Sequence, residues 1–416
     1  MLKLNQLAAA VALTVAAGVA SAGEAEVLHY WTSGGEAKSV AELKKMLEAK
    51  GHKWKDFAVA GGAGDNAATV LKSRAISGNP PAAAQVKGPA IQEWANEGML
   101  ANMDATAKAE KWDELLPKVV ADVMKNKGSY VAAPVNVHRV NWMWANPDVL
   151  KKAGVAGMPK SWDEFFAAAD KIKASGAVAV AHGGQNWQDF TTFESVVLGV
   201  GGAKFYTDAL VKLDPAALNS PTMTKSLETF RKIKGYTDPA SPGRDWNLTT
   251  AMVMNGKAGF QFMGDWAKGE FLAAGKAPGK DFLCAAAPGT ANAYTFNVDS
   301  FIMFKLKDAG AQKAQSDLAA SIMSTGFQEV FNLNKGSIPV RLGMKMDKFD
   351  ECGKTSAKDF VDTAKTGGLV PSVAHGMAIK PAAEGAIKDM VSQFWNDDKV
   401  SVADAQKKLV VAAATK

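Results

Sequence analysis

Short apolar segments alternate with helical patterns near the start of the chain. Residues 26–31 form a predicted strand, and apolar residues then recur at helical spacing over 40–47. A second predicted strand at 57–60 is followed by a predicted helix over 65–76 and by a buried strand at 82–87. Strands that alternate with helices predict an α/β fold with a parallel sheet covered on both faces.

Aromatic and polar side chains stand where two of these strands are expected to end. Trp31 closes the first predicted strand, and Lys87 closes the third. Gln85 lies on the same strand face as Lys87, because side chains in a strand alternate with a period of two. Ligands of parallel sheets bind beyond the carboxyl ends of the strands, so these residues are candidates for a binding site.

The first 22 residues have the organisation of an export signal. Lys3 precedes an uncharged apolar stretch over 7–19, and Ala20 and Ala22 provide the small residues of a cleavage site. We therefore expect residues 1–22 to be a signal peptide cleaved after Ala22, with release of the mature protein into a bacterial periplasm. Beyond this segment, no uncharged apolar run approaches the roughly 20 residues that a membrane span requires.

The chain contains two cysteines, Cys284 and Cys352. In an oxidising compartment, an even pair of thiols predicts one disulfide bond. Two free buried thiols are the alternative, and neither cysteine lies in a recognisable nucleophile motif.

The composition is that of an ordinary globular protein with two or three domain-sized cores: 416 residues, 47% hydrophobic and 22% charged. The net charge of +6 comes from 48 Lys and Arg against 42 Asp and Glu, without a basic block. This distribution is typical of solvated helix faces and argues against a nucleic-acid partner.

Motifs for a cofactor or a metal are weak. The segment 62–67 (GAGDNA) matches a dinucleotide-binding pattern, but the acidic residue expected about 20 residues later is missing. A glycine turn with Asp65 or Asn66 as helix cap is therefore favoured. The five histidines are scattered without metal-ligand spacing, so we expect no metal and no cofactor. A carboxylate pair for glycoside hydrolysis stays open, because two acids can meet from anywhere in the sequence.

Tryptophans beside polar residues in turn regions point to a sugar ligand. The chain has 11 tryptophans, and Trp31, Trp246 and Trp266 each have acidic or amide residues close by in the sequence. Flat rings can cover the faces of a pyranose, while polar side chains satisfy its hydroxyl groups. The alternative is that these tryptophans belong to the core.

Four stretches, taken in order, carry a family resemblance. They are VLHYWTSGGE at 27–36, APVNVHRVNWMWAN at 133–146, MNGKAGF at 254–260 with GDW at 264–266, and KGSIPVR at 335–341. On these stretches the chain resembles the extracellular solute-binding proteins of ABC sugar importers and, among them, the periplasmic glucose/mannose-binding proteins. The similarity extends over residues 24–410.

The resemblance implies a type II-like periplasmic-binding-protein fold, in which two α/β lobes close on a ligand in the cleft between them. It also implies three hinge crossings, near Pro134, Pro288 and Pro339. The implied lobes are 23–134 plus 289–339 (N-terminal) and 135–288 plus 340–416 (C-terminal).

Matching positions imply the ligand-binding residues. Trp31 and Trp266 would form opposite stacking walls, with Trp246 as a neighbour. The whole implied set is Trp31, Glu36, Lys87, Trp246, Trp266, Asp299, Lys335 and His375. Relatives often have Trp-Trp where this chain has Tyr30-Trp31, which leaves the role of Tyr30 open.

The resemblance implies a monomeric binding protein rather than an enzyme. It would capture a monosaccharide, glucose first and otherwise mannose or galactose, and deliver it to an ABC permease in the inner membrane. One alternative is a periplasmic glycoside-processing enzyme that uses Glu36 and Asp299 as acid and base. Another is the same binding fold with a disaccharide ligand.

Overall fold

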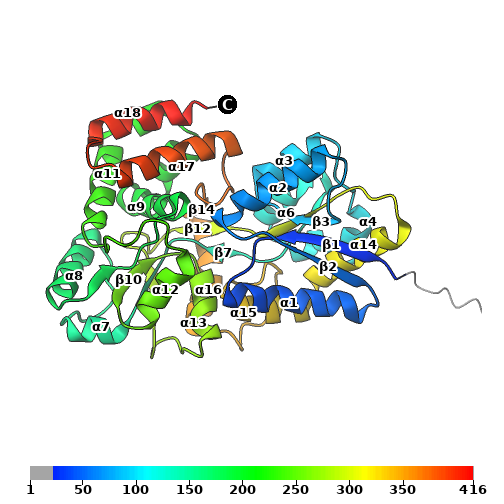
Figure 1. Ribbon diagram of the computed structural model, residues 1–416, viewed down its shortest axis with the longest axis horizontal. Helices are drawn as coiled ribbons and strands as arrows, with labels where there is room; N and C mark the ends of the chain where they lie inside the picture. Colours follow the sequence, from blue (N-terminus) through cyan, green and yellow to red (C-terminus); the bar gives the residue numbers. More distant parts are fainter. Residues whose placement is uncertain (1–21, 416) are drawn as a thin grey trace, which may run out of the picture.

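The computed structural model describes residues 22–415 of the chain. Two groups of helices and strands lie side by side along the longest axis, and each group is a lobe with a sheet of its own (Figure 1). The predicted signal peptide, apart from Ala22, lies outside the described residues. Within 22–415, no helix combines the length and the apolar character that would let it cross a membrane.

The first lobe contains the predicted parallel strands. Its five-stranded sheet has the order β2-β1-β3-β13-β6. The strands are β1 (Glu24–His29), β2 (Lys53–Ala58), β3 (Ala83–Gln85), β6 (Ala132–Pro134) and β13 (Ser300–Met303). β1 is parallel to β2 and β3, whereas β13 is antiparallel to β3 and β6. β2 begins before the predicted 57–60, because its polar start forms an edge strand beside β1.

Helices cover this sheet on both faces. They are α1 (Gly34–Ala49), α2 (Asp65–Ile76), α3 (Pro89–Asn96), α4 (Asp104–Ala109), α5 (Trp112–Leu115), α6 (Lys118–Met124), α14 (Ala309–Met323) and α15 (Thr325–Lys335). A single 3-10 turn spans Gly62–Gly64, and a short hairpin joins β4 (Lys125–Asn126) to β5 (Ser129–Tyr130). The apolar positions of α1 that recur at helical spacing are buried against the sheet, as predicted.

The second lobe has a four-stranded sheet of order β11-β8-β10-β9. The strands are β8 (Trp142–Ala145), β9 (Val178–Val180), β10 (Ala258–Phe262) and β11 (Leu283–Ala286). Its helices are α7 (Pro147–Lys152), α8 (Trp162–Ala174), α9 (Asn186–Tyr206), a π-helical turn (Thr207–Val211), α10 (Pro215–Leu218), α11 (Pro221–Lys234), α12 (Trp246–Met254), α13 (Trp266–Ala273), α16 (Glu351–Thr366), α17 (Pro381–Asn396) and α18 (Val402–Ala413).

A three-stranded sheet lies between the lobes (Figure 1). Its strands are β7 (His138–Arg139), β12 (Tyr294–Asn297) and β14 (Leu369–Pro371), with β12 in the middle. Val137 and Val298 belong to the core of the first lobe, whereas Met143 and Ala293 belong to the core of the second. The chain therefore changes lobes at β7 and changes back at β12. The number of hinge crossings and the exact lobe boundaries stay predictions.

The two cysteines form the predicted disulfide bond. Cys284 lies on β11 and Cys352 on α16, with their Cα atoms 6.2 Å apart. Both contact an apolar cluster of the second lobe that includes Trp142 and Phe282. The disulfide bond therefore connects α16, which follows the last elements of the first lobe in sequence, to the four-stranded sheet of the second lobe.

Removing this bond should lower the stability of the second lobe. The cysteines are 68 residues apart in sequence, and closing a loop of this size contributes roughly 4 kcal/mol in the chain-entropy description. We expect the double variant C284S/C352S to unfold at a clearly lower temperature than the wild type in calorimetry. A reducing agent should lower the wild-type midpoint and leave that of the variant unchanged. Equal midpoints for the two proteins under oxidising conditions would contradict this prediction.

Candidate functional site

A cavity of about 240 Å³ lies between the two lobes and is lined by side chains from both. Tyr30 and Trp31 enter it from the end of β1, and other walls come from the second lobe and from the junction sheet. All eight residues implied by the resemblance line this one cavity: Trp31, Glu36, Lys87, Trp246, Trp266, Asp299, Lys335 and His375. The structure therefore brings the whole implied set together, although it does not test whether they bind a ligand.

Trp31 is largely enclosed by the first lobe. Its ring packs edge-to-face on Phe301, with 5.6 Å between ring centroids, and at 5.1 Å from Phe331. The residue is 1% exposed. Trp31 thus belongs to the core of the first lobe and also lines the cavity. Its stacking on a ligand stays a prediction.

Two tryptophans come from helix starts of the second lobe. Trp266 begins α13, and its ring lies 5.2 Å from that of His138 and 4.9 Å from that of His375, steeply inclined to both. Trp246 begins α12 and is only partly buried. The aromatic side chains of the cavity are therefore Tyr30 and Trp31 from the first lobe and Trp187, Trp246 and Trp266 from the second.

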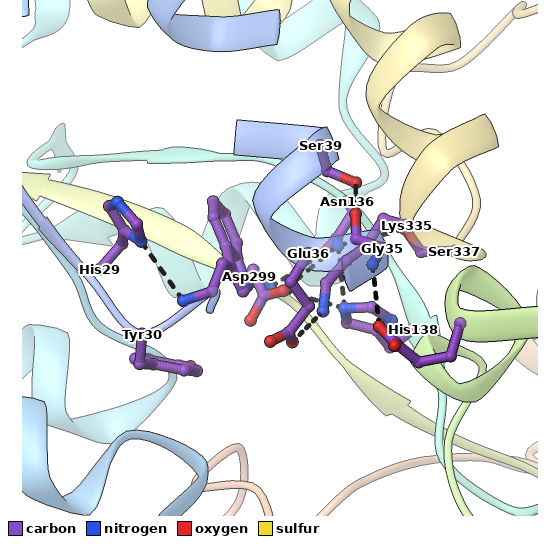
Figure 2. Close-up of polar contacts among 12 residues, drawn as sticks. His29, Tyr30, Gly35, Glu36, Ser39, Asn136, His138, Asp299, Lys335 and Ser337 are labelled. Atoms are coloured by element: carbon purple, nitrogen blue, oxygen red, sulfur yellow. Dashed lines mark hydrogen bonds and ion pairs between the residues drawn. The ribbon is translucent and has the colours of Figure 1, made fainter. Parts of the chain in front are cut away.

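An ion pair joins the start of α1 to the end of α15. Lys335 Nζ lies 2.5 Å from Glu36 Oε1 (Figure 2). The same ammonium group lies 5.9 Å from the centre of the Trp31 ring. Both charged residues are buried, so each needs a partner inside the protein, which the pair provides.

Asp299 is the most heavily hydrogen-bonded carboxylate of the cavity (Figure 2). Its oxygens accept from Asn136 Nδ2 at 3.3 Å and from His138 Nε2 at 2.9 Å. Gln85 Nε2, which the figure does not label, donates to it at 3.3 Å. Burial by itself would raise the pKa of Asp299. The charges of His138, Lys335 and Lys87 nevertheless hold the pKa of Asp299 well below its usual range, so the group is ionised.

His138 is a cavity residue that the ligand set did not include. It lies on β7 and contacts Asp299 with one ring nitrogen and Asp265, next to Trp266, with the other. It falls within the stretch 133–146 that carries the resemblance. Its role could not be read there because Asp265 and Asp299 are 127 and 161 residues away.

Lys87 and His375 both line the cavity, and the charge of Lys87 affects the pKa of His375. Lys87 Nζ lies 5.5 Å from the centre of the Tyr30 ring, and burial lowers the pKa of this lysine. Burial and the nearby Lys87 together hold the pKa of His375 well below its usual range, so the imidazole is neutral. Tyr30, whose role the sequence left open, thus lies beside the lysine at the first position of the pair.

The protonation pattern of His375 follows from its neighbour. The Thr191 hydroxyl donates to the Trp187 carbonyl at 2.8 Å, and the same oxygen lies 2.9 Å from His375 Nε2. Because the hydroxyl proton is already used, Thr191 accepts and His375 Nε2 carries the ring proton. Nδ1 of the neutral ring is then a hydrogen-bond acceptor.

A buried glutamate holds the loop that bears His375. The Glu194 carboxylate accepts hydrogen bonds from Ser372 Oγ at 2.7 Å and from the backbone N–H groups of Val373 and Ala374 at 2.9 and 3.1 Å. The backbone N–H of His375 in turn donates to Ser372 Oγ. Nothing in the sequence pattern singled out Glu194, which lies in the middle of the buried helix α9.

The glycine turn at 62–64 is present, but its predicted helix cap is wrong. Neither Asp65 nor Asn66 makes a side-chain cap bond to the start of α2. The Asn66 amide donates to the Ala60 carbonyl at 2.9 Å, and Asp65 pairs with Lys388 of α17 at 3.1 Å. The Asp65 carboxylate, which the local sequence assigned to the start of α2, is therefore paired with a residue of the other lobe.

Metal-binding geometry does not occur in the described part of the chain: residues 22–415 hold no group of three or more histidine, cysteine or acidic side chains arranged for a metal ion. The cavity instead combines aromatic surfaces, one ionised carboxylate, an ion pair, a lysine and a neutral histidine. Such a set can cover an apolar face of a ligand and exchange hydrogen bonds with several polar groups.

Comparison with known proteins agrees with this arrangement. The chain is 47% identical over 420 residues to a probable sugar-binding periplasmic protein of Brucella melitensis, with 99% of each chain covered. It is 46% identical over 413 residues to a protein of the same description from Rhizobium meliloti, again with 99% of each covered.

Solved structures with low sequence identity share the fold. A chitin oligosaccharide binding protein superposes with a TM-score of 0.80 at 17% identity, covering 94% of this chain and 98% of the other. The solute receptor AcbH, described as having an exclusive preference for β-D-galactopyranose, gives 0.80 at 18% identity with the same coverage. These matches confirm the two-lobed α/β fold. Because the family described as bacterial extracellular solute-binding protein also matches residues 32–321, the chain belongs to that family of binding proteins.

Proposed function

We propose that this protein is the periplasmic sugar-binding component of an ABC importer and that it captures a monosaccharide, with glucose as the first candidate and mannose or galactose next. The observation that carries the proposal is the cavity between the lobes, where four tryptophans (Trp31, Trp187, Trp246 and Trp266) meet a buried ionised carboxylate and two lysines. The names of the Brucella and Rhizobium relatives support a sugar as the ligand.

The size of the cavity favours a single sugar ring. Its volume of about 240 Å³ lies below the roughly 300–1,000 Å³ that is usual for pockets of drug-sized ligands. The preference of AcbH for one pyranose agrees with this choice, whereas the chitin oligosaccharide binding protein represents the longer ligands that the same fold accepts.

Each of the eight implied residues has a role in this proposal. Asp299 accepts hydrogen bonds from sugar hydroxyl groups, and Nδ1 of His375 accepts one more. Lys87 donates to hydroxyl oxygens, while Glu36 and Lys335 offer the free lone pairs and protons of their ion pair. Trp266 and Trp31 cover the two faces of the ring, and Trp246 closes the side, because axial C–H groups pack well on aromatic surfaces.

The electrostatics favour capture over catalysis. A glycoside hydrolase needs one carboxylic acid that keeps its proton near neutral pH. The pKa of Asp299 is held low, so this residue is not prepared to donate a proton, and the Glu36 carboxylate is paired with the Lys335 ammonium group. Membership of a binding-protein family points the same way.

In this proposal the lobes close on the bound sugar before the protein delivers it to a permease. In this proposal the lobes are 23–134 plus 289–339 and 135–288 plus 340–416, and the crossings near Pro134, Pro288 and Pro339 act as the hinge. A sugar that contacts both lobes favours the closed form by its differential affinity for the two states. An ABC permease in the inner membrane then recognises the closed, monomeric protein.

Calorimetric titration with single sugars tests the proposed ligand class. We expect glucose or another monosaccharide to bind and to raise the unfolding temperature, because the ligand binds only the folded state. The W266A variant should lose at least about 30-fold in affinity, as expected for truncation of a central aromatic contact.

The matched control is W94A. Trp94 packs on Phe304 in the first lobe and does not line the cavity, so this variant should keep the wild-type affinity. Maltose binding with no response to any monosaccharide would replace the proposed ligand by a disaccharide. Unchanged affinity in W266A would exclude the stacking role.

A charge pair spans the two lobes outside the cavity. Lys388 on α17 is buried and lies 3.1 Å from Asp65 of α2 and 3.4 Å from Glu384. The Asp65 side chain is 56% exposed, so solvent screens the pair and its contribution is modest. Since α2 belongs to the first lobe and α17 to the second, the pair stabilises the arrangement in which the lobes are in contact.

Neutralising this pair should weaken sugar binding without touching the cavity. We expect D65N to lower the affinity for glucose by up to about fivefold at low salt, and the effect should shrink as salt is added. D398N removes an exposed pair with Lys234 inside the second lobe and should leave the affinity unchanged. Identical affinities of D65N and D398N would show that the pair does not contribute to closure.

A further inference from the structure

His138 occupies a position that no ligand role explains. It is the first residue of β7, in the sheet between the lobes, and is 1% exposed. Its Nε2 atom lies 2.9 Å from Asp299 Oδ2, and its Nδ1 atom makes a short contact with Asp265 Oδ1 (Figure 2 shows the first of these). Asp265 directly precedes Trp266, so one imidazole ring lies between a carboxylate of the cavity and the start of the helix that carries its aromatic wall.

The geometry around His138 places one carboxylate at each ring nitrogen. Asn136 Nδ2 lies 2.9 Å from Nε2, and it has two acceptors for its own two protons in Asp299 and Ser337 Oγ, 3.3 and 3.2 Å away. Ser337 Oγ must accept there, because its own proton goes to Asn332 Oδ1 at 2.6 Å. The carboxylates on either side of His138 therefore each face a ring N–H, which makes the ring an imidazolium.

The charges around His138 agree with this assignment. Burial opposes a charged ring, but Asp265 and Asp299 outweigh burial and raise the pKa of His138 above its usual value. Two positive groups, Lys335 and Lys87, also act on Asp299, and the neutral His375 lies against the Trp266 ring. The neighbouring Arg139 directs its guanidinium group to Asp359, 2.7 Å away, rather than toward the ring.

We propose that His138, as an imidazolium ion, is a positioning residue that fixes Asp299 inside the cavity and couples it to Asp265 at the start of α13, so that sugar affinity depends on the His138 proton. This inference rests on the proposed function. When the proton leaves Nε2, a lone pair faces the Asp299 carboxylate and repels it. The carboxylate then turns away from the geometry in which it accepts sugar hydroxyl groups.

The direction of the pH effect follows from the raised pKa of His138. The proton is present below the ordinary pKa of 6.5 and is lost as the pH rises through the raised pKa of His138. Affinity is therefore constant on the acid side and falls on the alkaline side. Lys87, whose pKa is lowered, also loses charge at alkaline pH. The contribution of His138 is therefore measured as the part of the pH dependence of the affinity that disappears in a His138 variant.

The test is calorimetric titration of glucose from pH 6 to pH 9 with the wild type, H138Q and H52Q. A glutamine can donate to only one of the two carboxylates, so H138Q should bind at least about tenfold more weakly at pH 6 and show a flatter pH dependence. His52 is another buried histidine paired with an aspartate, Asp317 at 2.7 Å, far from the cavity. H52Q should therefore follow the wild-type curve.

Nitrogen NMR of the ligand-free wild type provides a second readout that does not need a folded variant. We expect both ring nitrogens of His138 to be protonated at pH 7, and a neutral tautomer at that pH would overturn the inference. Parallel affinity curves for the wild type and H138Q would overturn it while leaving the proposed function intact. A wild type that binds no sugar at any pH would overturn both.

Discussion

The arrangement of the cavity depends on keeping one buried carboxylate ionised. Moving a carboxylate out of water is costly unless opposite charge and hydrogen bonds compensate it. Asp299 receives that compensation from His138, Gln85 and Asn136 and from the lysines nearby. An ionised carboxylate accepts hydrogen bonds, and in the proposed function the donors are sugar hydroxyl groups.

Asp299 and His138 lie where the two lobes meet. Asp299 follows β12 and His138 lies on β7, two paired strands at which the chain changes lobes. Trp31 belongs to the first lobe and Trp266 to the second, so a ligand between them completes contacts that neither lobe offers alone. The Asp65–Lys388 pair adds a second, weaker tie outside the cavity. In the proposed function, binding and closure therefore depend on the same set of contacts.

Local patterns were sufficient to predict the three parallel strands of the first sheet and the helix over 40–47, because burial alternates with periods that belong to strands and helices. They did not predict β6 or the antiparallel β13, which complete the sheet. They also placed Trp31 and Lys87 at strand ends, where the cavity is found. The full set of cavity residues came from the family resemblance, since Glu36 and Lys335 are 299 residues apart and no local pattern joins them. The disulfide was predictable because the chain has only two cysteines.

Other features escaped prediction for the same physical reason. Asp65 was expected to cap α2, but its partner Lys388 lies 323 residues away in sequence. His138 and Glu194 are buried groups whose roles depend on distant partners rather than on their neighbours in the chain. Long-range electrostatic contacts of this kind become visible only when the fold brings their elements together.

The most direct test of this account is a crystal structure of the mature protein with bound glucose. The account predicts sugar density between Trp31 and Trp266, with hydroxyl oxygens within hydrogen-bond distance of the Asp299 carboxylate. Density at any other place on the protein, or a sugar in the cavity without a contact to Asp299, would contradict it.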